Sequence, residues 1–309
     1  MSSSHDIAWI ECGPQRLGLL PSQGGGVAEW TWQSGAEPVH LWRPWDRTSE
    51  DMYRSASFAM LPWSNRITAG GFEHRGRRYP VGLNRSGEPY PIHGDGWLQP
   101  WTLARPAADV AEMHLQSRHH GGNPWAYDAV QRFELVDGGL VQSVTVTHRG
   151  DDPLPYGLGL HPWFPLGPRT TVTARVGGVW LCGNDPIPTR HANEFPASWD
   201  LNTGAPMHGT LIDNGYTGWD GAATIAWPER GMSLRLTMEA LQTPQGLVDP
   251  AFCLVYRPPR GEAFCFEPIT QPIDAFHLDG RPGLVELQRD ESLTLRVRWQ
   301  VEAADSSRP

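Results

Sequence analysis

"SLTLRVRWQVEA" occupies Ser292–Ala303, near the end of the chain, and alternates apolar with polar residues throughout. Its apolar positions are Leu293, Leu295, Val297, Trp299 and Val301. Successive side chains of a β-strand point to opposite faces, so this period of two predicts a half-buried strand. The stretch therefore indicates a protein whose core is built from sheets.

The same alternation recurs along the chain. It appears in "SLRLTMEA" from Ser233, while "LVQSVTVTH" (Leu140–His148) and "TTVTARV" (Thr170–Val176) are rich in β-branched residues. Turn signals such as "VDGG" and "HRGDDP" separate these stretches. The best helix candidate is short, "SEDMYRSASFAM" at Ser49–Met60. No repeat or linker divides the chain, so we expect one all-β domain over residues 1–309, with frayed ends at about 1–6 and 303–309.

Composition narrows the class of protein. The 309 residues include 34 glycines and 29 prolines, which indicates many turns. The formal net charge of −9 argues against a nucleic-acid partner, because such binding depends on clustered Lys and Arg. The arginine-rich "EHRGRRYP" (Glu73–Pro80) is interpreted as a solvated hairpin.

Four cysteines, Cys12, Cys182, Cys253 and Cys265, show no CxxC spacing. We expect reduced thiols and no metal held by them. The N-terminus lacks the apolar region of a secretion signal, and no apolar run is long enough to span a membrane. The sequence thus predicts a cytoplasmic protein with no membrane partner.

Ionisable residues stand at predicted strand ends on restricted backbone. His161 and Glu267 each precede a proline. A residue before proline favours extended backbone, and proline itself is excluded from central strands. His93 lies in "PYPIHGDGW" and Arg66 in "LPWSNRITAGG". Loops at such ends often form sites. Each residue alone also fits a structural role, as a hydrogen-bonded histidine, a solvated turn or a loop clamp. These residues alone therefore indicate only a candidate His/Glu site.

Five motifs appear in order: "PWSNRITAGGF", "YPIHGDGW", "GLGLHPWFPL", "IDNGYTGWDG" and "FCFEPITQPIDAF". Together they resemble the aldose 1-epimerase (galactose mutarotase-like) family, over nearly the whole chain from Gly24 onward. The resemblance implies a β-supersandwich of two large antiparallel sheets in a single domain, with a sugar-binding cleft. It also implies interconversion of the α and β anomers of a free aldose without a cofactor.

The resemblance also implies roles for particular residues. Glu267 is expected to be the general base, His161 the general acid, and His93 a third catalytic group at the anomeric or ring oxygen. Arg66 and Asp213 are expected to bind sugar hydroxyls. Further expected substrate contacts are Asn65, Trp163, Tyr256 and Trp97. Trp63 is another residue expected to line the pocket. Asp220 competes with Asp213 for its role and is expected to be a turn residue.

Two departures from the family pattern leave the substrate open. "HPWFPL" places Trp163 and Pro165 where many relatives have Tyr and Asn, and "HGDG" introduces Asp95. A hexose-6-phosphate 1-epimerase is one alternative, and its extra cations would come from Arg75, Arg77, Arg78 or Arg85. A non-catalytic sugar-binding module is another. A metal enzyme using the adjacent His119 and His120 is disfavoured, because on a strand they would face opposite ways. We expect a monosaccharide as partner, no metal, and a monomer or homodimer.

Overall fold

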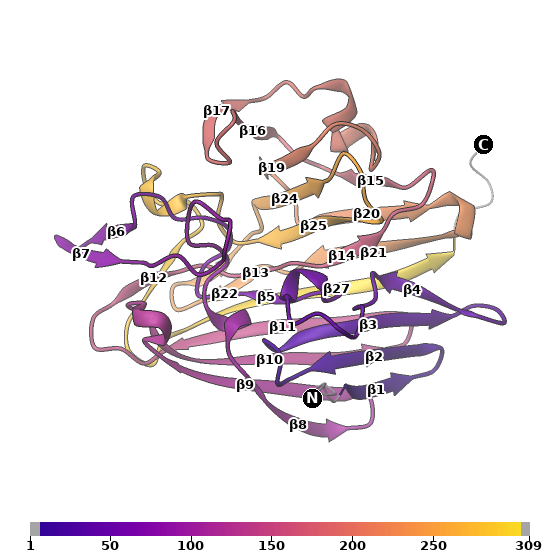
Figure 1. Cartoon of the computed structure of the whole chain (residues 1–309), viewed down its shortest axis with the longest axis horizontal. Helices are drawn as coiled ribbons and strands as arrows, with labels where there is room; N and C mark the ends of the chain where they lie inside the picture. Colours follow the sequence, from indigo (N-terminus) through magenta and orange to yellow (C-terminus); the bar gives the residue numbers. More distant parts are fainter. Residues whose placement is uncertain (1–6, 304–309) are drawn as a thin grey trace.

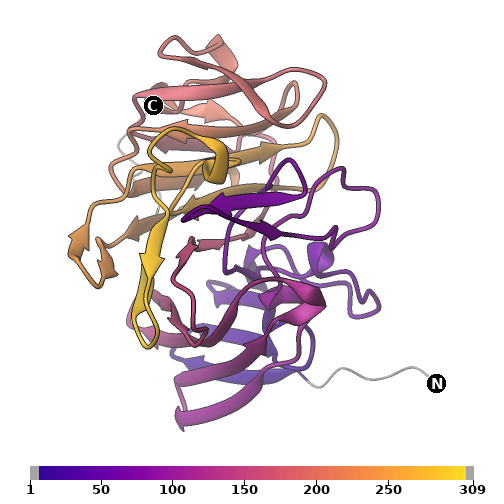
Figure 2. The same cartoon turned by 90° about the vertical axis from the view of Figure 1, so that its left-hand side faces the viewer.

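The computed structural model describes residues 7–303 and is built almost wholly from antiparallel strands. The all-β prediction is confirmed. The predicted frayed ends lie outside the described residues, except for Ala303, which ends the last strand. Viewed from the side, pink to orange strands form the upper part of the molecule and indigo to magenta strands the lower part (Figure 2).

The largest sheet has eleven strands, and β27 (Ser292–Ala303) lies between β11 (Gly139–His148) and β21 (Met232–Met238) within it. The strand predicted from alternation, β21, and those predicted from β-branched residues, β11 and β15 (Thr171–Ala174), all belong to it (Figure 1). In spatial order the sheet contains β18 (Ala205–Pro206), β15 (Thr171–Ala174), β20 (Ala222–Trp227), β21 (Met232–Met238), β27, β11 (Gly139–His148), β10 (Ala126–Val136), β9 (Val110–Arg118) and β8 (Thr102–Ala107), with β22 (Leu241–Thr243) on β27 and β23 (Gly246–Val248) on β22.

A second sheet of eight strands supplies the floor of the site described below. Its order is β17 (Pro188–Ala192), β16 (Gly178–Cys182), β19 (Ile212–Thr217), β24 (Phe252–Arg257), β25 (Ala263–Ile269), β13 (Gly159–Leu160) and β5 (Ala59–Met60), with β14 (Trp163–Pro165) also on β25. The smaller sheets are β1 (Ala8–Cys12), β2 (Gln15–Leu20), β3 (Gly26–Gln33) and β4 (Pro38–Trp42), then the ribbons β6 (Gly71–His74) with β7 (Arg77–Pro80) and β12 (Leu154–Tyr156) with β26 (Val285–Leu287).

Helical structure within residues 7–303 is limited to single 3-10 turns. The helix considered for Ser49–Met60 is reduced to one such turn, η1 (Met52–Arg54). His119 and His120 do not lie on a strand as supposed, because His119 adopts left-handed backbone and His120 begins η3 (His120–Gly122). The other turns are η2 (Gly96–Leu98), η4 (Ala197–Trp199), η5 (Leu201–Thr203), η6 (Pro228–Arg230) and η7 (Ala275–His277). No described helix is long and apolar enough to cross a membrane.

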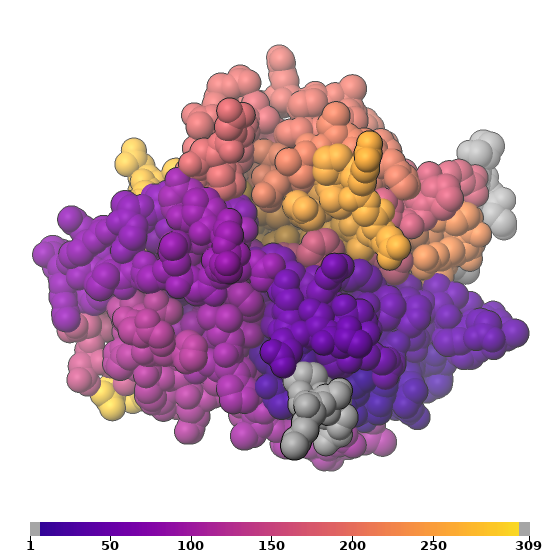
Figure 3. Space-filling view, viewed as in Figure 1, coloured from indigo at the N-terminus to yellow at the C-terminus, as the bar shows by residue number. Residues whose placement is uncertain are grey.

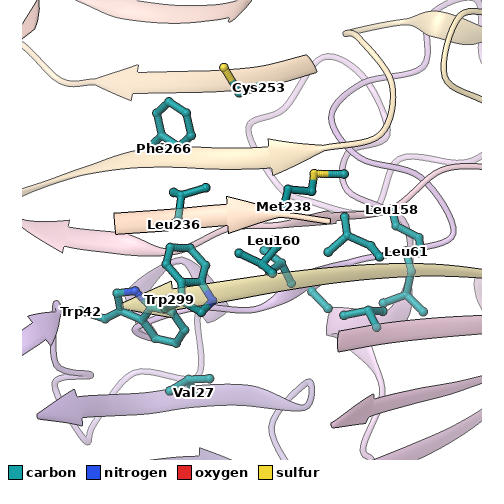
Figure 4. Packing of buried hydrophobic residues seen from close by; sticks show 14 of the residues in the cluster. Val27, Trp42, Leu61, Leu158, Leu160, Leu236, Met238, Cys253, Phe266 and Trp299 are labelled. Carbon is teal, nitrogen blue, oxygen red and sulfur yellow. The ribbon is translucent and has the colours of Figure 1, made fainter. Parts of the chain in front are cut away.

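The apolar face of β27 enters the core. Leu293, Leu295, Val297 and Trp299 are all fully buried, as the alternation predicts. Trp299 meets Trp42 edge-on, with ring centroids 5.2 Å apart (Figure 4). Edge-to-face packing of this kind suits the charge distribution of aromatic rings. The sheets are therefore joined through large aromatic side chains.

Strand β25 is buried on both of its faces. Phe264 and Phe266 point into the core, and Figure 4 shows Phe266 there beside Cys253 of β24. Cys265 and Glu267 alternate with these residues and so point to the opposite face. A carboxylate on a fully buried strand costs free energy unless something compensates it. The buried carboxyl group of Glu267 therefore needs compensating neighbours.

Candidate active site

The strand register sets His161 opposite Glu267. Trp163 of β14 pairs with Cys265 of β25 in antiparallel fashion. His161 lies two residues before Trp163, and Glu267 lies two residues after Cys265, so the two face each other across the sheet. Their closest side-chain atoms, Nε2 and Oε1, are 3.4 Å apart. The histidine and the glutamate predicted at separate strand ends thus form one pair.

The same register continues on the other side of β25. Tyr256 of β24 pairs with Cys265, and Asp213 of β19 pairs with Tyr256. Leu254, two residues before Tyr256, pairs with Glu267. Side chains two residues apart share a face, so these positions form adjoining rows on one side of the sheet. Residues distant in sequence are brought together by pairing alone.

A tight loop above this floor holds His93. The His93 N–H donates to the carbonyl of Asn65, and the Asn65 N–H donates back to Nδ1 of the His93 ring, at 2.9 and 3.0 Å. Because Nδ1 accepts, the proton of the neutral ring is on Nε2. Gly94 follows at φ +72°, where an added Cβ would lie 1.9 Å from the carbonyl oxygen of Leu61. Only glycine permits this close approach.

Asp95, the departure noted after His93, points away from the site. Its buried carboxylate accepts hydrogen bonds from the hydroxyl of Tyr127 and, at 3.0 Å, from Nδ2 of Asn123. Burial raises the pKa of Asp95. This network anchors the loop that carries His93 and leaves the lining unchanged. The other departures differ: Trp163 lines the site, whereas Pro165 pairs with Ala263 outside it.

These side chains surround a cavity of about 210 Å³. Pockets for drug-sized ligands measure roughly 300–1,000 Å³, so this cavity suits a ligand as small as a monosaccharide. A larger hollow of about 690 Å³ lies beside β22 and β23, without a histidine in its lining. The lining of the smaller cavity is Tyr53, Asn65, Arg66, Arg85, Glu88, Ile92, His93, His161, Trp163, Asp213, Leu254, Tyr256 and Glu267.

Burial dominates the electrostatics of the central pair. Glu267 is 2% exposed and His161 4% exposed. Loss of hydration raises the pKa of Glu267 well above its ordinary value and lowers the pKa of His161 from 6.5 to about 3. Both shifts favour the neutral forms. His161 therefore does not titrate near neutrality as an exposed imidazole would, because burial disfavours its charged form.

Glu267 has an unsatisfied oxygen. Its Oε2 is buried and has no hydrogen-bond partner among the described residues. Buried polar atoms are nearly always paired, and an exception calls for an explanation. Since Glu267 lines the cavity, this oxygen is placed to hydrogen-bond a group bound there.

Arg66 forms ion pairs with two carboxylates at the cavity wall. Its Nε donates to Oε2 of Glu88 at 3.1 Å, and its Nη1 lies 3.6 Å from Oδ2 of Asp213. Burial raises the pKa of Asp213, while the Arg66 charge acts in the opposite direction. A rigid guanidinium beside an acceptor carboxylate is well suited to hold neighbouring hydroxyl groups.

The aromatic residues predicted to line the site divide between wall and core. Trp163 and Tyr256 do line the cavity. Trp97 lies behind it and donates its Nε1–H to the carbonyl of Gly94, and Trp63 is fully buried against Trp125. Neither Trp97 nor Trp63 is in the lining, because both face the core side of their loops.

Other candidates have structural partners elsewhere. Asp220 accepts the N–H of Ala222 in an exposed turn, as expected, so of these two aspartates Asp213 is the one that lines the cavity. Arg75, Arg77 and Arg78 bond Glu286, Asp152 and the carbonyl of Ala69 respectively, outside the lining. All four cysteines are free, as expected.

The apolar lining residues Ile92 and Leu254 were not predicted from sequence. Among the polar ones, Tyr53 and Glu88 were missed, and Arg85 was considered only as a phosphate-binding cation. Arg85 forms two hydrogen bonds with Asp51, at 2.8 and 3.0 Å, and stacks over Tyr53 at 3.7 Å. Tyr53, Arg85 and Glu88 lie in η1 or in irregular segments, where no periodicity marks them. The proline after Glu88 resembles the His-Pro and Glu-Pro pairs and was the one available signal.

One group among residues 7–303 has ligand atoms spaced for a metal: His161, Cys265 and Glu267, all within 4.8 Å of one another. Imidazole, thiolate and carboxylate form a donor set that divalent zinc accepts. An ion at this position would bind the same atoms that an acid–base pair needs. Metal binding and acid–base use of these side chains therefore exclude each other.

The structure thus combines an all-β fold with a buried His–Glu pair on the floor of a small polar cavity. The chain belongs to the aldose 1-epimerase family, whose sequence profile matches residues 19–300.

The uncharacterized protein YphB of Escherichia coli K12 is 32% identical over 293 residues, which are 92% of this chain and 96% of that protein. Two solved structures are similar to this chain over nearly its whole length. One is an Escherichia coli K12 protein named as a candidate aldose 1-epimerase, with TM-score 0.86 and 26% identity, covering 96% of this chain and 99% of that one. The other is a galactose mutarotase-like protein of Clostridium acetobutylicum, with TM-score 0.82 and 17% identity over 98% and 97% of the two chains, and it supports the fold alone.

Proposed function

We propose that this protein is an aldose 1-epimerase that interconverts the α and β anomers of a free, uncharged aldose. The observation that carries the proposal is the pair formed by His161 and Glu267, 3.4 Å apart on the floor of a monosaccharide-sized cavity. The anomeric hydroxyl and the ring oxygen of an aldose are bonded to the same carbon. An acid and a base that serve both oxygens must therefore lie close together.

The reaction is two proton transfers and one bond cleavage. Glu267 removes the proton from the anomeric hydroxyl, and the freed electron pair forms the carbonyl at C1. The bond from C1 to the ring oxygen breaks, and His161 protonates that oxygen. Rotation about the C1–C2 bond presents the other face of the aldehyde, and the same transfers run backwards to close the ring. Each proton transfer contributes roughly 10²–10⁴-fold to the rate.

Burial favours the ring-opening direction. Opening converts an ionised pair, Glu267 carboxylate with His161 imidazolium, into a neutral acid with a neutral imidazole. The low polarity that raises the pKa of Glu267 and lowers that of His161 stabilises this neutral pair. The two groups share one mobile proton, so they titrate as a coupled unit. An exposed pair would have a weaker drive toward the neutral state.

The remaining polar groups position the sugar. His93 directs its Nε2–H into the cavity as a fixed donor, and burial lowers its pKa well below the usual value, so the ring is neutral. It is placed to support negative charge on an anomeric or ring oxygen. Arg66 and Asp213 offer donors and acceptors for other hydroxyls, and Asn65 accepts from Arg66 to keep it in place. Trp163 and Tyr256 provide flat walls for the C–H faces of the ring.

Charge pairing in the lining favours an unphosphorylated sugar. The two guanidinium groups of the lining are already matched, Arg66 with Glu88 and Asp213, and Arg85 with Asp51. A phosphate needs unpaired cations or free N–H donors. Within the described lining, neither arginine is free for that purpose. The hexose-6-phosphate alternative therefore has less support than a neutral aldose.

The test is polarimetry of freshly dissolved α-D-glucose and α-D-galactose with wild-type protein, with the phosphorylated hexoses assayed in parallel. We expect the wild type to accelerate equilibration of at least one neutral sugar. Acceleration confined to phosphorylated sugars would refute the neutral-substrate proposal. Sugar binding measured by tryptophan fluorescence, with no acceleration of any sugar, would replace the enzyme by a binding module.

A further inference from the structure

Tyr53 lines the cavity, and it has no part in the reaction proposed above. Its hydroxyl is the only buried tyrosine hydroxyl of residues 7–303 that lacks a hydrogen-bond partner among the described residues. The hydroxyls of Tyr127, Tyr156 and Tyr216 contact the Asp95 carboxylate, the His148 ring and the Trp199 carbonyl respectively. Buried polar groups are nearly always paired, so the Tyr53 hydroxyl needs an explanation.

The backbone of Tyr53 is held on both sides. Its N–H donates to Oδ1 of Asp51, the residue that caps η1, at 3.0 Å. Its carbonyl accepts from Nη2 of Arg43 at 2.6 Å. Arg85 stacks over the ring, 3.7 Å from its centroid, and is itself bonded to Asp51. Asp51 therefore fixes both the backbone of Tyr53 and the cation that covers one face of its ring.

The ring of Tyr53 lies beside both histidines of the site. Its centroid is 5.4 Å from that of His161 and 5.9 Å from that of His93. Phe58 and Trp97, which belong to the core, pack on it at 5.5 and 5.9 Å. A side chain that is already held in place loses little conformational entropy when a ligand binds to it. The hydroxyl is thus fixed in position next to the groups that act on the anomeric centre.

The hydroxyl of Tyr53 lies among the polar groups of the cavity. Burial raises the pKa of Tyr53 well above its usual value, so the hydroxyl keeps its proton and is able to donate. The charged groups that also act on this pKa are Arg85, Glu88, Glu267 and Arg66, all of which line the cavity. None of these described side chains is hydrogen-bonded to the hydroxyl. Its donor therefore remains available to a group bound in the cavity.

We propose that Tyr53 is a substrate-binding residue that donates a hydrogen bond from its hydroxyl to a hydroxyl group of the bound sugar. This inference rests on the proposed function, because it takes the ligand to be an aldose. The anomeric and ring oxygens are already assigned to Glu267, His161 and His93. The oxygen left for Tyr53 therefore belongs to a hydroxyl on another carbon, and Tyr53 contributes to the choice of sugar instead of to proton transfer.

Such a contact discriminates between sugars that differ by one hydroxyl. A sugar without the matching hydroxyl leaves the buried Tyr53 hydroxyl unpaired, whereas the matching sugar satisfies it. One neutral hydrogen bond corresponds to roughly threefold to tenfold in affinity. Because the bond involves no reacting atom, it holds the ground state and the transition state equally, and its loss is expected in KM and not in kcat.

Tyr53→Phe tests the contact, because it removes the hydroxyl and keeps the ring. Calorimetry measures the affinity of wild type and variant for D-glucose or D-galactose, whichever wild type binds more tightly, and for its four forms that lack the hydroxyl at C2, C3, C4 or C6. Polarimetry gives kcat and KM for the parent sugar. We expect the variant to bind the parent sugar roughly threefold to tenfold more weakly. For one deoxy sugar the two proteins should bind equally well, because the contact is already absent there.

Tyr216→Phe is the matched control, because Tyr216 lies in the core and its hydroxyl donates to the carbonyl of Trp199 at 3.0 Å. The control should lower Tm, since a protein hydrogen bond is lost, and leave sugar affinity unchanged. Tyr53→Phe should show the opposite pattern. It should keep the Tm of the sugar-free protein, because the hydroxyl that it removes bonds none of the described residues.

Two results would overturn the proposal: unchanged affinity of Tyr53→Phe for the parent sugar, or an equal loss for the parent sugar and all four deoxy sugars. A fall in kcat with KM unchanged would also overturn it, because Tyr53 would then act on the reacting atoms. If wild type binds sugars but accelerates none, the proposed function fails. The comparison of deoxy sugars then still decides whether Tyr53 makes the contact.

Discussion

Glu267→Gln separates the chemistry of the site from its folding. The glutamine keeps the shape of the side chain on β25 but cannot take the proton from the anomeric hydroxyl. Removal of a general base costs roughly 10²–10⁴-fold in kcat. Sugar binding is expected to persist, because the other wall residues are unchanged. The loss should therefore appear in kcat with little change in KM.

The same substitution should stabilise the fold at high pH. The unfolded chain releases the Glu267 proton near the ordinary pKa of 4.5, whereas burial raises the pKa in the folded chain well above it. Between those values the folded state binds more protons, so wild-type stability falls as pH rises. Glutamine has no proton to lose. At pH 8 we expect a gain of about 1–3 kcal/mol from removing a poorly compensated buried charge, or a few degrees in Tm.

The assay is polarimetry together with thermal unfolding at pH 8 and at pH 4.5. Glu239→Gln is the control, because Glu239 is half-buried and contacts Arg296 and Arg298 away from the cavity. Activity of Glu267→Gln within tenfold of wild type would refute its assignment as base. A Tm below wild type at pH 8, or a difference that does not shrink toward pH 4.5, would refute the account of its burial.

His161→Phe keeps the stack on Phe58 and should lower kcat by at least 10²-fold in polarimetry. It should also lose less stability than wild type on acidification, measured by melting curves at pH 7 and 4.5. Burial lowers the pKa of His161 from 6.5 to about 3. The stability that the neutral ring contributes is therefore present above pH 6.5 and is lost as the pH falls toward 3. His93→Asn should keep the positive-φ backbone, which asparagine tolerates, and lower kcat roughly 10²-fold. His93→Ala should lower both kcat and Tm. Equal Tm values for the asparagine and alanine variants would contradict this. Trp299→Ala should cost about 3–5 kcal/mol in urea unfolding, and a cost below 1 kcal/mol would contradict its place in the core. Dialysis against a chelator should leave the mutarotation rate unchanged. A rate that is lost on dialysis and restored only by added zinc would indicate a catalytic metal held by His161, Cys265 and Glu267.

Strands were predictable from sequence because alternation is a local signal. β27 and β21 follow directly from their own residues. The meeting of His161 with Glu267 follows from the pairing of β14 with β25, which joins segments about a hundred residues apart. Alternation does not determine such a register. Family resemblance supplied the two residues, and the strand pairing supplies the reason they face each other.

Aromatic residues show where sequence reasoning reaches its limit. Trp97 and Trp163 both stand beside predicted site histidines, yet one packs behind the cavity and the other lines it. The direction of a side chain at the end of an irregular segment depends on neighbours that sequence does not reveal. The same holds for the pKa of His161, which depends on burial. Tyr53 and Glu88 were missed because the segments that contain them show no periodic pattern of apolar residues.

The division between sheet and loops has an evolutionary consequence. Glu267 and Asp213 lie on strands of the eight-strand sheet, and His161 lies between its strands β13 and β14. Tyr53, Arg85, Glu88 and His93 come from segments outside those strands. Figure 3 shows the purple surface of the early segments beside the orange surface of the later strands. Most of the wall can drift in length and composition while the acid–base pair stays in register. For the proposed epimerase, this division lets sugar specificity change through the loops while the acid–base pair on the sheet is kept.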